Sequence, residues 1–165
     1  MKKILIQTYS QYYENKITDE NFYEWFKNSK VVDSKGQPLV VYHGSRFEFE
    51  EFEGDSFFTD DYMNADGYAA GENVYEVYLS IQNPFILDCK GKKWDDIEGG
   101  STQNVVGNVD RNLYDGAIFL NIKDSWIDDV DYQDASVVYV AFNSNQVKSV
   151  DNKGTWDKNN RNIYE

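Results

Sequence analysis

The stretch Val40-Val41-Tyr42-His43-Gly44-Ser45 gives the first indication of how this chain folds. An apolar run that stops at a polar triad is typical of a buried strand, here over residues 39–42, that ends at a functional site. His43 is the only histidine in the sequence, and an imidazole can donate or accept a hydrogen bond near neutral pH. Gly44 would let a ligand approach the backbone closely, and Ser45 adds a hydroxyl group. A lone histidine can also be a packed residue, so a functional role for His43 has to be inferred from the segments around it.

A short amphipathic helix is predicted upstream of this strand, over residues 19–29. Thr18 suits the N-cap position, because a threonine hydroxyl can accept a hydrogen bond from the first turn. Phe22, Trp25 and Phe26 follow at the spacing that places side chains on one helix face. We expect this apolar face to pack against the rest of the domain.

Further elements are predicted downstream of the strand. Asp60-Asp61 can cap a helix, in which Tyr62, Ala65 and Tyr68 have helical spacing. More strands are expected at residues 56–59, 74–81, 117–122 and 137–142, and a polar turn at 143–145 precedes the segment 146–150. Residues 90–112 are polar and are interpreted as a loop with at most one helical turn.

Length and patterning indicate one domain of the α+β class. The sequence has 165 residues, which suits a single domain, and it contains neither internal repeats nor a linker-like stretch. Several strands joined by few, short helices favour a mixed fold. We expect residues 1–165 to form this domain, with a core over about 19–150 and an extended tail over 151–165.

The charge balance argues against direct nucleic-acid binding. Sixteen basic and twenty-nine acidic residues give a formal net charge of −13, and an acidic surface repels a polyanion. A local pocket of backbone N–H groups and hydroxyls can still bind a small anion. The acidity serves solubility, or it suits association with a basic protein surface.

Composition also bears on metals, membranes and location. Cys89 is the single cysteine, so an intrachain disulfide cannot form, and together with the single histidine it excludes a structural zinc site. The apolar run Ile4-Leu5-Ile6 is too short for a signal peptide or a membrane span. We therefore expect a cytoplasmic protein that uses no metal and contacts no membrane.

Several short segments of the sequence are similar to segments that occur together in one known family. They are Trp25–Asp33, Gly36–Ser45, Asn145–Val150 and Gly154–Asn160. With them, the chain resembles the ADP-ribosyltransferase domains of phage polyvalent and head-morphogenesis proteins, in the wider class of diphtheria toxin and the poly(ADP-ribose) polymerases. The resemblance covers about residues 22–165. It implies a split β-sheet core and NAD as the substrate.

The resemblance also implies a role for the His-Gly-Ser triad, which matches the first motif of the family. His43 would hydrogen-bond a ribose hydroxyl of NAD, and the backbone of Gly44 would pair with the nicotinamide carboxamide. Ser45 completes the motif.

The second motif of the family is an aromatic strand followed by a helix that carries a tyrosine. Ser56–Asp60 matches the strand, and Tyr68 follows Phe58 by ten residues, as the family pattern requires. Tyr68 and either Phe57 or Phe58 would then sandwich the nicotinamide ring, because an electron-poor pyridinium is attracted to an aromatic face.

The third motif departs from the family pattern. Where glutamate-bearing members have an acidic residue on the last strand, this chain has Val138. Gln146 is the nearest polar candidate for a catalytic role, but a neutral amide cannot act as a general base. Asp134 and Ser136 could substitute only if the register of the strand shifted.

Two functions follow from these observations. The first is a phage or prophage ADP-ribosyltransferase that transfers ADP-ribose from NAD to a macromolecule of the host or of a rival phage, in counter-defence. The alternative is a catalytically inactive relative, which acts as an acidic protein-binding inhibitor or as a phage accessory domain. Val138 and the net charge of −13 favour the alternative.

Overall fold

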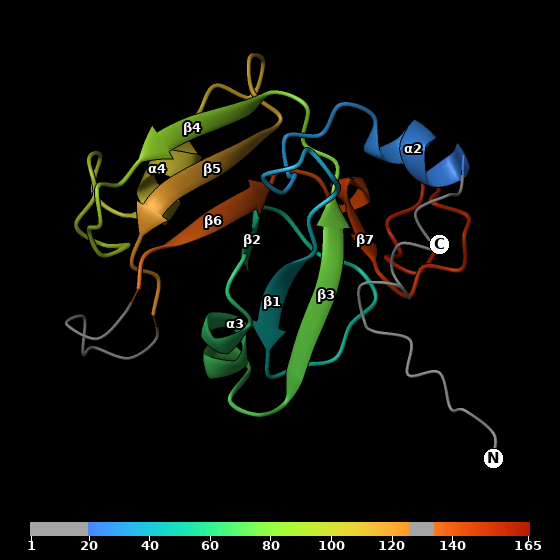
Figure 1. The fold of residues 1–165 in the computed structure, drawn as a ribbon, viewed down its shortest axis with the longest axis horizontal. Coiled ribbons are helices and arrows are strands. Elements are labelled where there is room, and N and C mark those ends of the chain that lie inside the picture. The colour runs from blue at the N-terminus through green and yellow to red at the C-terminus, as the bar shows by residue number, and fades with distance from the viewer. Residues whose placement is uncertain (1–19, 126–133) are drawn as a thin grey trace.

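Residues 20–125 and 134–165 are described by the computed structural model, and the predicted N-cap Thr18 lies outside them. In this part of the chain the strands form one sheet in the order β4-β5-β6-β2-β1-β3-β7 (Figure 1). The strands are β1 Val41–Ser45, β2 Ser56–Thr59, β3 Asn73–Leu79, β4 Pro84–Asp88, β5 Gly116–Ile122, β6 Ser136–Ala141 and β7 Val147–Ser149. The helices are α2 Glu20–Phe26, α3 Tyr62–Ala69 and α4 Thr102–Asn108, with a 3-10 turn, η2, at Ser144–Gln146. The predicted α+β class is confirmed.

The sheet is split into two halves that meet between β1 and β2. Among the described residues, one pair, Tyr42 with Thr59, joins these two strands. By contrast, β1 pairs with β3 at five positions and β2 pairs with β6 at four. Figure 1 shows β4, β5 and β6 running across the molecule, while β1 and β3 run at a large angle to them. The split β-sheet that the family resemblance implies is therefore present.

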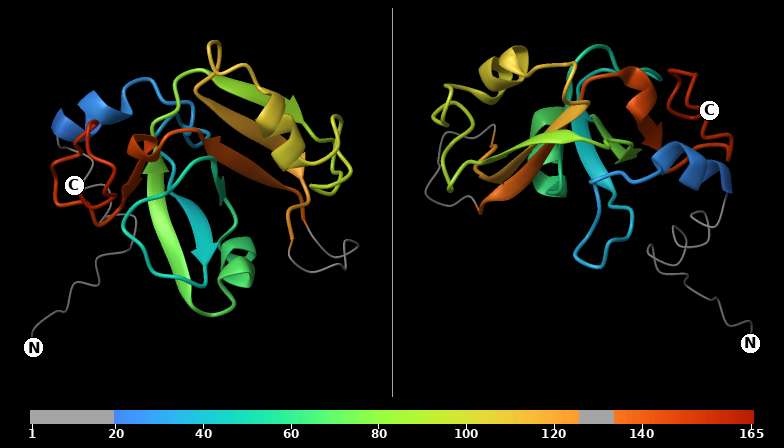
Figure 2. Two further views of the ribbon diagram at one scale, coloured as in Figure 1. Left: turned by 180° about the vertical axis from the view of Figure 1, so that it is seen from behind. Right: turned by 90° about the horizontal axis from the view of Figure 1, so that it is seen from above.

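The helices cover different parts of the sheet. Figure 2 shows α4 over the half formed by β4, β5 and β6, with α2 beside the C-terminal segment at the other end of the molecule. The predicted apolar face of α2 is buried, and its Phe22 ring lies 4.8 Å from that of Trp156. Among the described helices, none has the length and apolar character needed to cross a membrane.

The C-terminal segment, residues 151–165, contains neither helix nor strand but reaches into the core. Trp156 and Ile163 are both buried. The buried Lys148 of β7 donates from Nζ to the backbone carbonyls of Asn160 and Asn162, each at 2.9 Å. These contacts tie the segment to the edge of the sheet.

Three elements differ from the sequence predictions. The strand predicted over residues 39–42 lies at Val41–Ser45 instead, because pairing with β3 continues through the His-Gly-Ser triad. The triad is thus part of a strand. The strand β4, which begins at Pro84, is absent from the predicted strands. Proline can be the first residue of an edge strand, where its missing N–H leaves no ladder bond unmade. The helix α4, at Thr102–Asn108, lies in the segment 90–112, for which the sequence predicts a loop with one helical turn.

The helix α3 lies directly on β1 at Gly44. A Cβ atom on Gly44 would be 1.8 Å from the carbonyl oxygen of Ala65 and 2.7 Å from the amide nitrogen of Ala69. The predicted reason for this glycine was the approach of a ligand, but the structure shows that the backbone of the helix occupies the space. Asp61 caps the helix as predicted, since its Oδ1 accepts from the N–H of Met63 at 2.9 Å.

We predict that Gly44→Ala destabilises the domain. The added methyl group would meet backbone atoms of α3, so the helix would have to move away from the strand. Overpacking of this kind typically costs about 1–3 kcal/mol. Urea unfolding followed by circular dichroism measures the change in the free energy of unfolding.

Gly107→Ala is the matched control. No atom lies within 4 Å of a Cβ at Gly107, and alanine in a helix is favoured over glycine by about 0.5–1 kcal/mol. This variant should be as stable as the wild type or slightly more stable. Equal stability of Gly44→Ala and the wild type would contradict the described packing of α3.

Candidate functional site

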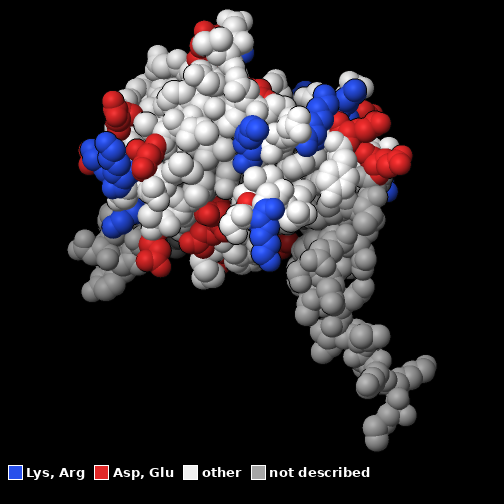
Figure 3. Space-filling view, turned by 45° about the horizontal axis from the view of Figure 1, so that its top comes forward, with Lys and Arg blue, Asp and Glu red and all other residues white. Residues whose placement is uncertain are grey.

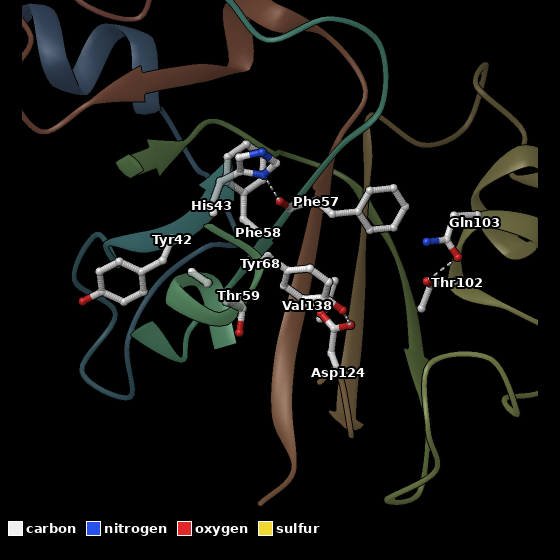
Figure 4. Close-up of a pocket in the computed structure, with 12 residues that line it drawn as sticks. Tyr42, His43, Phe57, Phe58, Thr59, Tyr68, Thr102, Gln103, Asp124 and Val138 are labelled. Atoms are coloured by element: carbon white, nitrogen blue, oxygen red, sulfur yellow. Dashed lines mark hydrogen bonds between the residues drawn. The ribbon is translucent and has the colours of Figure 1, made fainter. Parts of the chain in front are cut away.

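One pocket gathers most of the predicted site residues where the two halves of the sheet meet. It is lined by His43 and Gly44 of β1, residues 57–59 of β2, Tyr68 of α3 and Val138 of β6, among others (Figure 4). Its cavity volume is about 190 Å³, which is below the range of about 300–1,000 Å³ for sites that enclose a drug-sized ligand. The pocket therefore suits one ring system of a larger ligand, whose remainder would lie outside.

His43 enters this pocket with a defined tautomer. Its Nδ1 lies 2.7 Å from the carbonyl oxygen of Phe57, and because a carbonyl only accepts, Nδ1 must carry the hydrogen. Burial lowers the pKa of the imidazole, against a smaller opposing effect of this hydrogen bond, so the ring is neutral near pH 7. Its Nε2 then carries an unprotonated lone pair.

The Nε2 atom of His43 is available to a ligand. No described residue bonds to it, and the described part of the chain contains no buried side-chain nitrogen or oxygen without a partner. Nε2 must therefore be reachable from solvent. A neutral imidazole with Nδ1 protonated can accept, at Nε2, a hydrogen bond from a ligand hydroxyl.

Four aromatic rings hold the imidazole of His43 in place. The ring centroids of Phe52 and Phe58 lie 5.0 and 5.5 Å from it, and those of Phe49 and Tyr75 lie 6.2 and 6.5 Å away. Phe58 is only 2% exposed. Its ring lies beside that of His43 (Figure 4), so its main contribution is to support the imidazole.

Phe57 and Tyr68 are the aromatic residues that a ligand can reach more easily. Tyr68 is 41% exposed, and Phe57 is half-buried on the opposite face of β2 from Phe58. Both line the pocket, from α3 and β2 respectively (Figure 4). Of the two strand aromatics Phe57 and Phe58, Phe57 is thus the better placed to contact, together with Tyr68, a planar ring of a ligand.

Asp124 is a pocket residue that the sequence did not single out. It follows β5, and its Oδ1 accepts a hydrogen bond from the hydroxyl group of Tyr68 at 2.9 Å. Burial raises the pKa of its carboxyl group, and the bond from Tyr68 partly offsets that rise. The two residues are 56 positions apart, so no local pattern could have indicated their contact.

Val138 occupies the pocket at the position of the third motif. It pairs with Thr59 across β6 and β2, and its side chain is 1% exposed. This register leaves Asp134 exposed and buries Ser136 beside Ile122. Neither of these two is among the residues that line the pocket.

Two of the predicted site residues lie outside the pocket. The hydroxyl group of Ser45 accepts from the N–H of Phe47 at 3.0 Å. Gln146 lies in η2, and its side-chain amide is fully occupied by the backbone. It accepts from the N–H groups of Phe142 and Asn143, and it donates to the carbonyls of Ser80 and Asp115, at 2.8–3.1 Å.

Comparisons with known proteins place the chain in a sequence family. A family model described as ADP-ribosyltransferase in polyvalent proteins matches residues 33–157, which is well over half of the chain. The matched range contains His43, Tyr68 and Val138. No curated protein and no solved structure matches the chain.

We predict that His43 makes stability depend on pH. Its pKa is lower in the folded chain than its unfolded value of about 6.5. The unfolded state therefore binds the proton more readily, and the contribution of His43 is complete above about pH 6.5 and is lost as the pH falls below it. The difference in unfolding free energy between the wild type and His43→Gln should narrow from pH 7.5 to pH 5. A difference that stays constant over this range would contradict a buried, neutral imidazole.

Proposed function

We propose that this chain, which belongs to the family of ADP-ribosyltransferases in polyvalent proteins, binds NAD in the pocket around His43 and transfers its ADP-ribose group. ADP-ribosyltransferases use NAD as substrate. The observation that carries the proposal is the convergence of a histidine, a strand aromatic and a helical tyrosine, from three separate elements, on one cavity.

In the proposed complex the nicotinamide half of NAD lies in the pocket. Nε2 of His43 accepts from a ribose hydroxyl, and the rings of Phe57 and Tyr68 contact the nicotinamide. The size of the cavity, about 190 Å³, suits this half alone. Among the described residues Gly44 pairs with Val74 of β3 only, so its edge toward β2 has no strand partner and can face the carboxamide.

The chemistry of the transfer explains why such a pocket is useful. When the bond between nicotinamide and ribose breaks, its electron pair leaves with the nicotinamide and positive charge develops on the sugar. A site promotes this step by holding the leaving group and by placing negative charge near the anomeric carbon. Stacking of the pyridinium ring on aromatic faces contributes to the first of these.

The acceptor and the biological role belong to the same proposal. A macromolecule of a bacterial host or of a rival phage would receive the ADP-ribose group, in the host cytoplasm, and the modification would counter a defence. Family membership is the support for this part of the proposal.

A second candidate is an inactive relative that binds a basic protein. Val138 at the third motif and the net charge of −13 favour it. On the face drawn in Figure 3, basic and acidic side chains are interspersed, and neither kind forms a continuous track. That face therefore offers no obvious surface for a strongly charged partner.

We predict that NAD binds to the wild type and that Tyr68→Ala weakens binding. Loss of an aromatic ring from a stacked base typically costs about 1–3 kcal/mol, or about five- to more than a hundredfold in affinity. Isothermal titration calorimetry with NAD measures both dissociation constants.

Tyr23→Ala is the control for this experiment. Tyr23 is 47% exposed, like Tyr68, but it lies on α2 and is not a pocket residue. Its replacement should leave NAD affinity unchanged. A folded wild-type protein that binds no NAD would rule out the proposed function and leave the inactive relative as the better description.

A further inference from the structure

We propose that Asp124 supplies the carboxylate that the site lacks at Val138, and that it acts as a catalytic residue in ADP-ribosyl transfer. This inference rests on the proposed function of the pocket. The residue at the family position for the acid, Val138, is aliphatic here. The same cavity, however, contains an acidic side chain, that of Asp124, which follows β5.

The path of β5 explains how Asp124 reaches the pocket. Phe119 pairs with Val138 and Ile122 pairs with Ser136, with a bulge between them. The end of β5 therefore lies beside the beginning of β6, two residues before the third-motif position Val138. Two residues beyond Ile122, Asp124 enters the cavity that Val138 lines (Figure 4).

The carboxylate of Asp124 is held at one oxygen and open at the other. Oδ1 accepts from the hydroxyl group of Tyr68 at 2.9 Å. No described residue bonds to Oδ2, and since the described part has no buried unpaired side-chain oxygen, Oδ2 is accessible. Among the described residues that line the pocket, Asp124 is the one with a negative charge.

Asp124 can perform both tasks that Val138 cannot. Its charge stabilises the positive ribose as the C1′–N1 bond to nicotinamide breaks and the electron pair leaves with nicotinamide. A lone pair of the acceptor oxygen, from water in the case of hydrolysis, then forms the new bond to C1′, and the proton of that oxygen passes to Asp124. Burial, which raises the pKa of this carboxyl group, makes it a better proton acceptor than a surface aspartate.

Tyr68 would have two separable functions. Its ring contacts the nicotinamide, and its hydroxyl group positions Asp124. Burial and the neighbouring Asp124 raise the pKa of that hydroxyl group, so it remains a hydrogen-bond donor. The variant Tyr68→Phe keeps the ring and removes the donor.

Asp124→Asn tests the proposal directly. The amide oxygen can still accept from Tyr68, so the fold should be preserved while the negative charge is lost. We expect the NAD dissociation constant to change less than about threefold and nicotinamide release to fall about a hundred- to a thousandfold, as for other single groups that stabilise transition-state charge. Asp124→Glu should retain part of the activity, and Tyr68→Phe should lower release without weakening NAD binding.

Asp134→Asn is the matched control, because it removes one exposed carboxylate near the start of β6 that does not line the pocket. Both NAD affinity and release should be unchanged. The role of Asp124 would be overturned if Asp124→Asn released nicotinamide as fast as the wild type, or if it lost NAD binding and nicotinamide release equally. NAD binding by the wild type would still support the proposed function of the pocket in either case. Wild-type protein that binds NAD but releases no nicotinamide would also overturn the role of Asp124. Should Asp124→Asn fail to fold, Tyr68→Phe decides by the same two measurements.

Discussion

The contact between the backbone of α3 and that of β1 at Gly44 is the constraint on which the site depends. With no side chain between them, helix and strand are held at a fixed separation. His43 precedes the glycine on the strand, and Tyr68 lies one turn beyond Ala65 on the helix. The relative position of these two residues is therefore set by main-chain atoms, and the pocket is formed before any ligand arrives. Preorganisation of this kind lowers the entropic cost of binding.

The same histidine also connects the two halves of the sheet. Backbone pairing between β1 and β2 is limited to Tyr42 and Thr59 in the described residues, and the bond from His43 to the carbonyl of Phe57 is a second connection across the gap. The separation of the strands beyond that pair creates the cavity, and the imidazole at its edge bridges them. The loss of backbone hydrogen bonding and the presence of the cavity are thus two results of one geometry.

The sequence predicted the fold class and most strands, because alternating apolar residues and capping aspartates are local signals. It also predicted that His43, Tyr68 and one of the strand aromatics Phe57 and Phe58 would meet, but through family resemblance, since nothing local relates a strand to a helix twenty-five residues away. The surroundings of Gln146 could not be predicted, because its polar side chain satisfies backbone groups of three chain segments, which only the folded arrangement reveals. Asp124 could not be predicted for a related reason. It follows a strand in a stretch without any motif, and its position in the pocket depends on the bulge in β5 and on its hydrogen bond from Tyr68.

The use of Gln146 has a chemical consequence for the durability of the protein. Its Nε2 donates to the carbonyls of Ser80 and Asp115. Deamidation would replace that nitrogen with an oxygen, and two half-buried carbonyl oxygens would then face a third acceptor. Each carbonyl left without a partner costs about 1–3 kcal/mol. A slow hydrolysis at one amide, with no change elsewhere in the chain, would therefore loosen the junction of β3, β5 and β6 as the protein ages.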